Sequence, residues 1–329
     1  MNSQKKIRVL LPFLLLAMGC SQAPVAPRAG ERELTERSRA TLINFTHAES
    51  PLLRSHALEA LADSDQASAG KIILEGLNDN YWGVRFTACM AIMKLKYAPA
   101  KPLLVKAMND PNLSVQAAAA GTLHVLGDQR FTSRLGQMLF DKNPIVRRNA
   151  ATVLGRMGDP GAVKLLRSAL RDDDISLKLQ VLEAMTLLGN SRAIRLMINY
   201  CRSVYDDECI LAMLTLAQAR SNEALDQITY VYETSSSQDR LGMRLVAARA
   251  LAMMGDNRGR NVALSSLQYY TGRLGQAATI RTLAAMALGE MKDKTTLGAL
   301  EQALSDQDPD VQIIAASAIL KTVQTNLPF

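Results

Sequence analysis

The chain has few side chains of the kinds that carry out catalysis. Its 329 residues include three histidines, His47, His56 and His124, and four cysteines. No Ser-His-Asp ordering, glycine-rich phosphate loop or zinc-ligand spacing is present. The acidic run at 172–174 is typical of the turn before a helix rather than of a metal site. We therefore expect no catalytic residues, no metal and no cofactor.

Two cysteines have a spacing that suits redox chemistry. Cys201 and Cys209 stand in CRSVYDDEC and flank an expected turn between two helices. In an oxidising compartment they would form a disulfide, whereas in a reducing one they would be thiols of the core or the turn. The sequence leaves both open. Cys89 falls on an apolar helical face, where we expect an inert thiol.

Tyrosines gather in one third of the chain. Tyrosine supplies contact area at little conformational cost and is frequent at binding hot spots. Packing beneath irregular repeats would explain the same gathering equally well. The candidate partner-binding tyrosines are Tyr200, Tyr205, Tyr230, Tyr232, Tyr269 and Tyr270.

Three cations, Lys71, Lys164 and Arg195, share one column on the second helix of their repeats. We expect these helices to line the concave surface of the array. The column would then attract an acidic partner or anionic lipid headgroups, although a solvated face is the commoner explanation.

The first twenty residues have the pattern of an export signal. Lys5, Lys6 and Arg8 precede an apolar run over 9–18, which is too short to cross a bilayer. The run ends in LAMGC and resembles the lipobox of bacterial lipoproteins, although Ala17 stands where that family usually has leucine. The resemblance implies a lipid on Cys20, with Ser21 favouring transport to the outer membrane.

The net charge does not indicate a nucleic-acid partner. The chain has 38 basic and 31 acidic side chains, and 35 basic ones remain once the three cations of the signal are removed. That small excess is ordinary for a surface, and nucleic acid is not expected outside the cytoplasm.

A repeat organises the rest of the chain. Val115, Val146 and Leu177 are 31 residues apart, and so are Gly127, Gly158 and Gly189. The period extends back to Val84 and Leu53 and forward, less regularly, to the C-terminus, which gives about nine units. From Tyr200 to Tyr270 the units are longer, and such departures often serve binding.

Each unit predicts a helical hairpin. In the unit from Asp141, apolar residues at Val146, Ala150, Val153 and Leu154 share one side of a helix. Gly158 then suits the left-handed position that ends it, and a second amphipathic segment follows. One hairpin cannot bury its apolar side alone, so neighbours must stack.

The unit DKNPIVRRNAATVLGRMGD, from Asp141, resembles the short bacterial HEAT repeats of the phycobilin-lyase type. The resemblance implies an all-α fold, an α-solenoid (superhelix) of about nine HEAT-type hairpins, and a surface for protein contacts. The His-Glu pairs that hold iron in the HEAT-repeat hydroxylases are missing. A cation follows the anchor position of most units, and in HEAT arrays this column resembles the ladders that link neighbouring layers. Its members are Arg54, Arg85, Arg147, Lys178, Arg244 and Arg281.

We therefore expect a signal peptide over 1–19, a lipidated cysteine and Pro/Ala-rich tether over 20–30, a capping helix over 31–52 and the solenoid over 53–329. The expected function is a non-catalytic scaffold that binds a protein partner at the cell envelope, anchored by its lipid to the outer membrane and facing the periplasm. The alternative is an enzyme or chromophore-handling factor like the phycobilin-lyase relatives, which would require a ligand-sized pocket with convergent polar groups.

Overall fold

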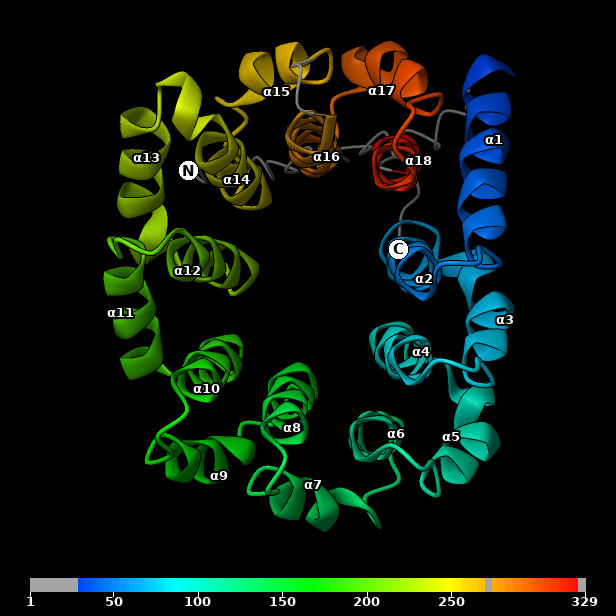
Figure 1. The fold of residues 1–329 in the computed structure, drawn as a ribbon, viewed down its shortest axis with the longest axis vertical. Helices are drawn as coiled ribbons and strands as arrows, with labels where there is room; N and C mark the ends of the chain where they lie inside the picture. The colour runs from blue at the N-terminus through cyan, green and yellow to red at the C-terminus, as the bar shows by residue number, and fades with distance from the viewer. Residues whose placement is uncertain (1–28, 270–273, 325–329) are drawn as a thin grey trace, which may run out of the picture.

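The computed structural model describes residues 29–269 and 274–324. This part of the chain contains 18 α-helices and no strand. The prediction of an all-α solenoid with about nine hairpins is confirmed, because the helices alternate between an inner and an outer layer (Figure 1).

The inner layer consists of α2 (Pro51–Ser64), α4 (Trp82–Leu95), α6 (Leu113–Val125), α8 (Pro144–Arg156), α10 (Ile175–Leu187), α12 (Asp206–Gln218), α14 (Leu241–Met253), α16 (Leu274–Met291) and α18 (Pro309–Val323). The outer layer consists of α1 (Ala29–Phe45), α3 (Gln66–Gly76), α5 (Lys101–Ala107), α7 (Thr132–Met138), α9 (Ala162–Ala169), α11 (Ser191–Tyr200), α13 (Leu225–Thr234), α15 (Arg260–Ser266) and α17 (Leu297–Ala303). Short 3₁₀ turns at Ala98–Ala100, Asn222–Ala224, Gln238–Arg240 and Lys294–Thr296 precede α5, α13, α14 and α17.

Local sequence fixes where the inner helices begin and end. The side chain of Asn143 accepts a hydrogen bond from the Ile145 amide, and Pro144 occupies the first helical position. At the other end Gly158 has a φ of 71°, which glycine adopts without a Cβ clash. The left-handed positions keep the 31-residue period up to Arg220, and the next two, Gly255 and Lys292, follow after 35 and 37 residues. The irregularity therefore begins after α12.

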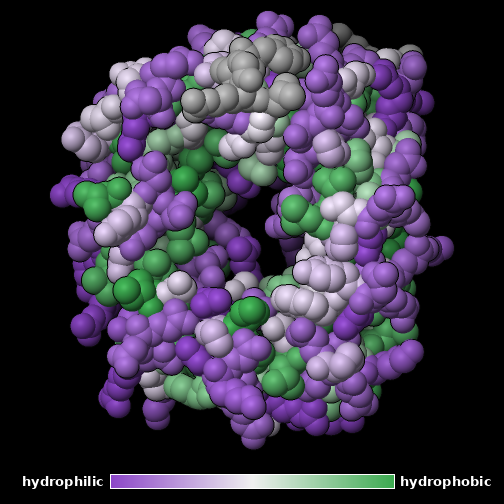
Figure 2. Space-filling view, viewed as in Figure 1, coloured by the Kyte–Doolittle hydropathy of each residue, from purple (hydrophilic) through white to green (hydrophobic). Residues whose placement is uncertain are grey.

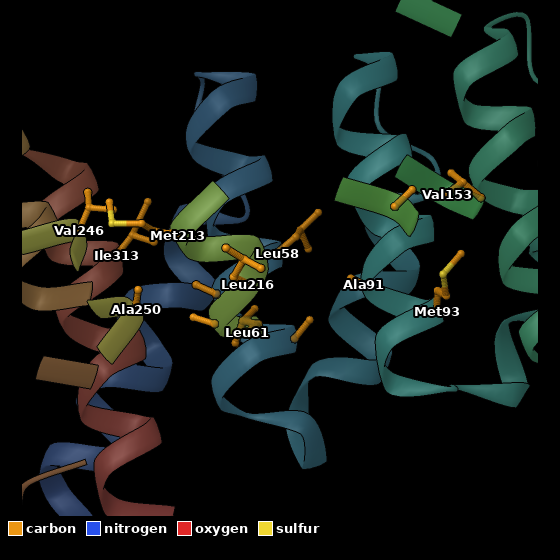
Figure 3. Packing of buried hydrophobic residues seen from close by; sticks show 14 of the residues in the cluster. Leu58, Leu61, Ala91, Met93, Val153, Met213, Leu216, Val246, Ala250 and Ile313 are labelled. Carbon is orange, nitrogen blue, oxygen red and sulfur yellow. The ribbon is translucent and has the colours of Figure 1, made fainter. Parts of the chain in front are cut away.

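Small residues let the inner helices approach one another closely. A Cβ on Gly155 would lie 2.6 Å from Ala184 Cα on the next inner helix, and one on Gly289 would lie 2.9 Å from Ala318 Cβ. An inner layer follows a shorter path than an outer one, so its helices need this close spacing. The buried core runs between the layers; Figure 3 shows parts of it, among them Leu58 and Leu61 on α2 and Met213 on α12.

The array curves back on itself and closes into a ring. The last inner helix, α18, packs against both α1 and α2 (Figure 1). On α1 the buried side chains Leu34, Ser38 and Leu42 are four residues apart and so share one face. Helix α1 begins two residues before the segment 31–52 expected as a capping helix and otherwise falls within it, and it lies at the junction between the two ends of the array. We call this junction of α1 and α2 with α17 and α18 the seam.

Polar pairs join the two sides of the seam. Arg37 contacts Glu301 at 2.6 Å, Lys294 contacts Glu31 at 3.0 Å, and His56 Nδ1 lies 2.7 Å from Asp310 Oδ1.

A chain of ion pairs crosses the seam on the inner side. Lys321 lies 2.9 Å from Glu290 on one side and 3.9 Å from Asp63 on the other. Asp63 in turn pairs with Lys94, and Glu290 lies 4.0 Å from Arg249. Five consecutive inner helices, α4, α2, α18, α16 and α14, are thereby linked.

The expected signal peptide, Cys20 and the tether up to residue 28 lie outside the described residues. None of the described helices combines the length and apolarity needed to cross a lipid bilayer.

Candidate functional site

The arginine column has a structural role at most of its positions. Arg54 donates to both carboxylate oxygens of Asp79, 25 residues ahead, at 2.8 and 2.7 Å. Arg85 binds Asp110 in the same way, and Arg281 binds Asp306. Each of these aspartates begins the turn into the next inner helix, so the pairs join adjacent layers as the resemblance implied.

Electrostatics at these pairs follow from burial and hydrogen bonding. Burial alone would raise the pKa of Asp79, but the hydrogen bonds from Arg54 and from the Tyr81 amide hold it below its usual value. The pKa of Arg54 is raised chiefly by its hydrogen bond to Asp79. The ladder is interrupted at Arg244, whose guanidinium lies 4.8 Å from the centre of the Tyr232 ring.

The six candidate tyrosines do not form one surface. Tyr205 and Tyr230 are exposed, Tyr200 and Tyr269 are partly buried against the core, and Tyr232 is buried. Tyr270 lies outside the described residues. Tyr230 and Tyr232 differ because two residues turn a helix by about 200°, which puts them on opposite faces. The candidate tyrosines that the structure describes therefore do not form a single cluster.

One exposed tyrosine borders an open groove on the outer layer. The groove has a volume of about 620 Å³ and lies between α11 and α13, with Ile198, Arg202, Asp226 and Tyr230 in its lining.

The column of three cations that we expected on the concave surface lies on the outer layer instead. Lys71, Lys164 and Arg195 belong to α3, α9 and α11, which are helices of the outer layer (Figure 1). All three side chains are exposed. The expectation that second helices line the concave surface was wrong, because the first helix of each repeat carries the alanines and glycines that allow the tighter inner path.

The two candidate disulfide cysteines lie close together at the expected turn. Both side chains are buried free thiols, and Cys209 Sγ donates to the Cys201 carbonyl at 3.1 Å. Burial raises the pKa of Cys201 to about 12, and the neighbouring Cys209 adds to the shift. The bridge is not formed in this structure, and its formation under oxidising conditions stays a prediction.

The three histidines are in separate places. His47 Nε2 lies 3.6 Å from Glu75, His56 contacts Asp310 across the seam, and His124 Nδ1 lies 2.9 Å from the Thr132 hydroxyl. Among residues 29–269 and 274–324, no three His, Cys, Asp or Glu side chains are grouped as metal ligands would be.

The inner side of the seam encloses a cavity of about 420 Å³ between α2, α14, α16 and α18. Most of its charged groups already pair with one another, as His56 does with Asp310 and Lys321 with Glu290.

The most distinctive surface is one that the sequence reasoning missed. Eight of the eleven large hydrophobic side chains exposed in the described chain lie at or just before the starts of the first six inner helices. We call them the apolar rim: Leu52, Tyr81, Leu113, Phe140, Ile145, Ile175, Val204 and Tyr205.

The rim lies on one face of the ring. Every inner helix before α18 is followed by an outer helix that returns the chain to the starting side, so all inner helices begin on the same face. Exposure is high at Ile175 (66%), Tyr205 (68%) and Val204 (88%). In the space-filling view hydrophobic patches alternate with hydrophilic ones around a central opening (Figure 2).

The rim has the composition of an interface. Exposed charges of both signs stand between the apolar side chains, including Asp173, Asp207, Lys142 and Arg171. Apolar anchors with polar groups around them are typical of protein-binding surfaces. The available signal was a large apolar residue right after a capping residue, as in Asn112-Leu113 and Asp174-Ile175.

Comparisons with known proteins agree with the repeat architecture. A family model described as HEAT repeats matches residues 39–124, 71–139 and 132–213. No sequence among curated proteins matches the chain.

Three solved structures illustrate the likeness. Human deoxyhypusine hydroxylase, in complex with glycerol, is 20% identical, with coverage of 78% of this chain and 96% of that one and a TM-score of 0.38. The complex of CpcE and CpcF of phycocyanin lyase from Nostoc sp. PCC7120 is 17% identical, with coverage of 79% and 96% and a TM-score of 0.43. Kap121p is 14% identical, with coverage of 86% and 37% and a TM-score of 0.34. At these identities the likeness concerns the fold alone.

Proposed function

The chain belongs to the HEAT-repeat family, and we propose that it is a non-catalytic scaffold that binds a protein partner and is held at the cell envelope by a lipid on Cys20. The observation that carries the proposal is the apolar rim, which places at least one exposed apolar side chain near the start of each of six consecutive inner helices. A partner that covers the apolar rim would bury its apolar side chains without any rearrangement of the ring.

Photo-crosslinking tests the rim as the binding surface. p-Benzoylphenylalanine placed at Ile145 or Ile175 in cells should give protein adducts, because these side chains would face the partner. The matched control is Leu196, an exposed hydrophobic residue on the outer helix α11. Equal adduct yields from Leu196 and from the rim, or no protein adduct from the rim, would contradict the proposal.

Substitution gives a second test of the same surface. Ile145→Asp with Ile175→Asp should abolish the adduct formed from Tyr205, because both charges would be buried at the interface. Both side chains are exposed, so the variant should unfold at the wild-type temperature.

The lipid anchor has its own test. Cys20→Ser should remove the acyl mass from the mature protein and change its membrane fractionation. Wild-type protein without acyl mass would refute the anchor and leave the rim proposal intact.

The alternative, an enzyme or chromophore-handling factor, has one supporting observation, which is the seam cavity of about 420 Å³. Biliverdin is a suitable probe of it. We expect the absorption spectrum of biliverdin to be unchanged when the protein is added. A spectrum that the wild-type protein shifts and the His56→Ala variant does not would favour the alternative.

A further inference from the structure

The face opposite the apolar rim carries more cations than acids. It consists of the seven turns that follow α4, α6, α8, α10, α12, α14 and α16, each taken from two residues before to four residues after its left-handed residue. These turns carry nine exposed lysines and arginines against one exposed acid, Glu223, and five partly exposed acids, Asp128, Asp159, Asp256, Glu290 and Asp293. We call this surface the basic face.

The side chains of four cations of the basic face form no ion pair or hydrogen bond with another described residue: Lys96, Arg192, Arg220 and Lys292. The other five, Lys94, Arg130, Arg156, Arg258 and Lys294, each lie within 4 Å of an acid.

Backbone conformation is a second, independent observation on this face. The left-handed residue is glycine after α6, α8, α10 and α14, and a cation at the other three positions, where Lys96, Arg220 and Lys292 have φ of 49°, 51° and 53°. A residue with a Cβ is disfavoured there by about 1 kcal/mol relative to glycine. The attraction of a helix C-terminus for cations does not account for this choice, because cations in the last helical turn would supply it without the strain.

The described part of the chain begins beside the basic face. Glu31, in the first turn of α1, pairs with Lys294 of that face at 3.0 Å. Eight residues separate Cys20 from Ala29, where α1 begins, so the two are at most about 30 Å apart when this segment is extended. A membrane-inserted lipid on Cys20 would therefore keep the basic face within that distance of the headgroups.

We propose that the basic face docks on the phosphate groups of anionic lipids, so that the ring lies flat on the membrane with its apolar rim turned away. The proposal rests on the envelope location proposed above. The contact is electrostatic, so it weakens as salt is added. A lipid together with a basic surface gives firmer attachment than the lipid alone, and only the second contact fixes which face looks outward.

Vesicle binding by the unlipidated chain tests the face separately from the lipid. The chain from Ser21 to Phe329 contains every helix of the ring. It should co-sediment with vesicles of phosphatidylcholine and phosphatidylglycerol in equal parts at low salt, and far less with phosphatidylcholine alone.

The test variant replaces the three left-handed cations by glycine: Lys96→Gly, Arg220→Gly and Lys292→Gly. Glycine suits their positive φ, so the ring should fold at least as well as the wild type. Each cation at an anionic surface contributes about fivefold to binding, so the variant should bind about a hundredfold more weakly. The control removes three exposed cations from the outer layer, with Lys71→Gln, Lys164→Gln and Arg195→Gln, and should bind like the wild type.

Equal losses in the two variants would overturn the proposal, because net charge and not the basic face would then govern binding. Equal binding to neutral vesicles, or no vesicle binding alongside tight binding to a single-stranded DNA oligonucleotide, would overturn it as well. None of these results bears on the adducts formed at the rim, so failure here and failure of the proposed scaffold function are distinguishable.

Discussion

Replacing Arg281 by methionine tests whether the ladder holds the repeats together. Arg281 donates to both carboxylate oxygens of Asp306 at 2.7 and 2.8 Å, and their side chains are only 6% and 4% exposed. Methionine keeps much of the side-chain volume but leaves the Asp306 carboxylate buried without its cation. Loss of one partner from a buried pair costs about 3–5 kcal/mol.

The cost should depend on pH in a defined direction. Burial opposes ionisation of Asp306, but the Arg281 and backbone hydrogen bonds hold its pKa below the usual value. A lowered carboxyl pKa contributes stability above the unfolded value of about 4, and the contribution disappears as the pH falls through the folded value. The difference between wild type and variant should therefore be largest near pH 7 and shrink in acid.

Urea unfolding followed by circular dichroism measures this difference. The control is Arg130→Met, which removes an exposed partner of Asp128 and should leave the urea midpoint unchanged. An Arg281→Met midpoint equal to that of the control, or a difference that grows toward acid pH, would refute the structural role of the ladder.

Two further outcomes follow from burial. Tyr232→Ala should lower the free energy of unfolding by about 3 kcal/mol, because the Tyr232 ring is buried and lies against the Arg244 guanidinium. Tyr230 is exposed, so Tyr230→Ala should change the free energy of unfolding by less than about 0.5 kcal/mol. Equal effects of the two substitutions in thermal unfolding would contradict the placement of the two tyrosines on opposite helix faces. Peptide mapping of unreduced protein from the native envelope should find Cys201 joined to Cys209 by a disulfide if that compartment oxidises them. If both thiols instead react with an alkylating reagent once the unreduced protein is unfolded, no disulfide joins them.

The repeat architecture could be predicted from the sequence because it depends on local signals. The spacing of Gly127, Gly158 and Gly189 marks successive helix ends, and a cap such as Asn143-Pro144 marks a helix start. The column of cations was predictable for the same reason, because Arg147 and the other members of the column each directly follow the anchor residue of their repeat.

Closure of the ring could not be predicted in this way. It depends on the sum of small rotations between successive hairpins, which contacts such as Gly155 with Ala184 determine. The choice of inner layer depends on the same packing, so Lys71 and its column were assigned to the wrong side. The apolar rim could not be predicted because Leu113 or Ile175, taken singly, resembles any apolar residue beside a turn.

The two ends of the array meet in a closed ring, and carbodiimide cross-linking of the monomeric protein can detect this closure. This reagent joins an amine to a carboxylate in contact without adding a spacer. Lys321 and Glu290 lie on adjacent repeats and are 2.9 Å apart, so their cross-link forms in an open or a closed array and serves as the control. A closed ring predicts, in addition, a cross-link between Lys294 and Glu31, which are 3.0 Å apart across the seam. Recovery of the Lys321–Glu290 peptide without the Lys294–Glu31 peptide would contradict the ring and leave an open superhelix.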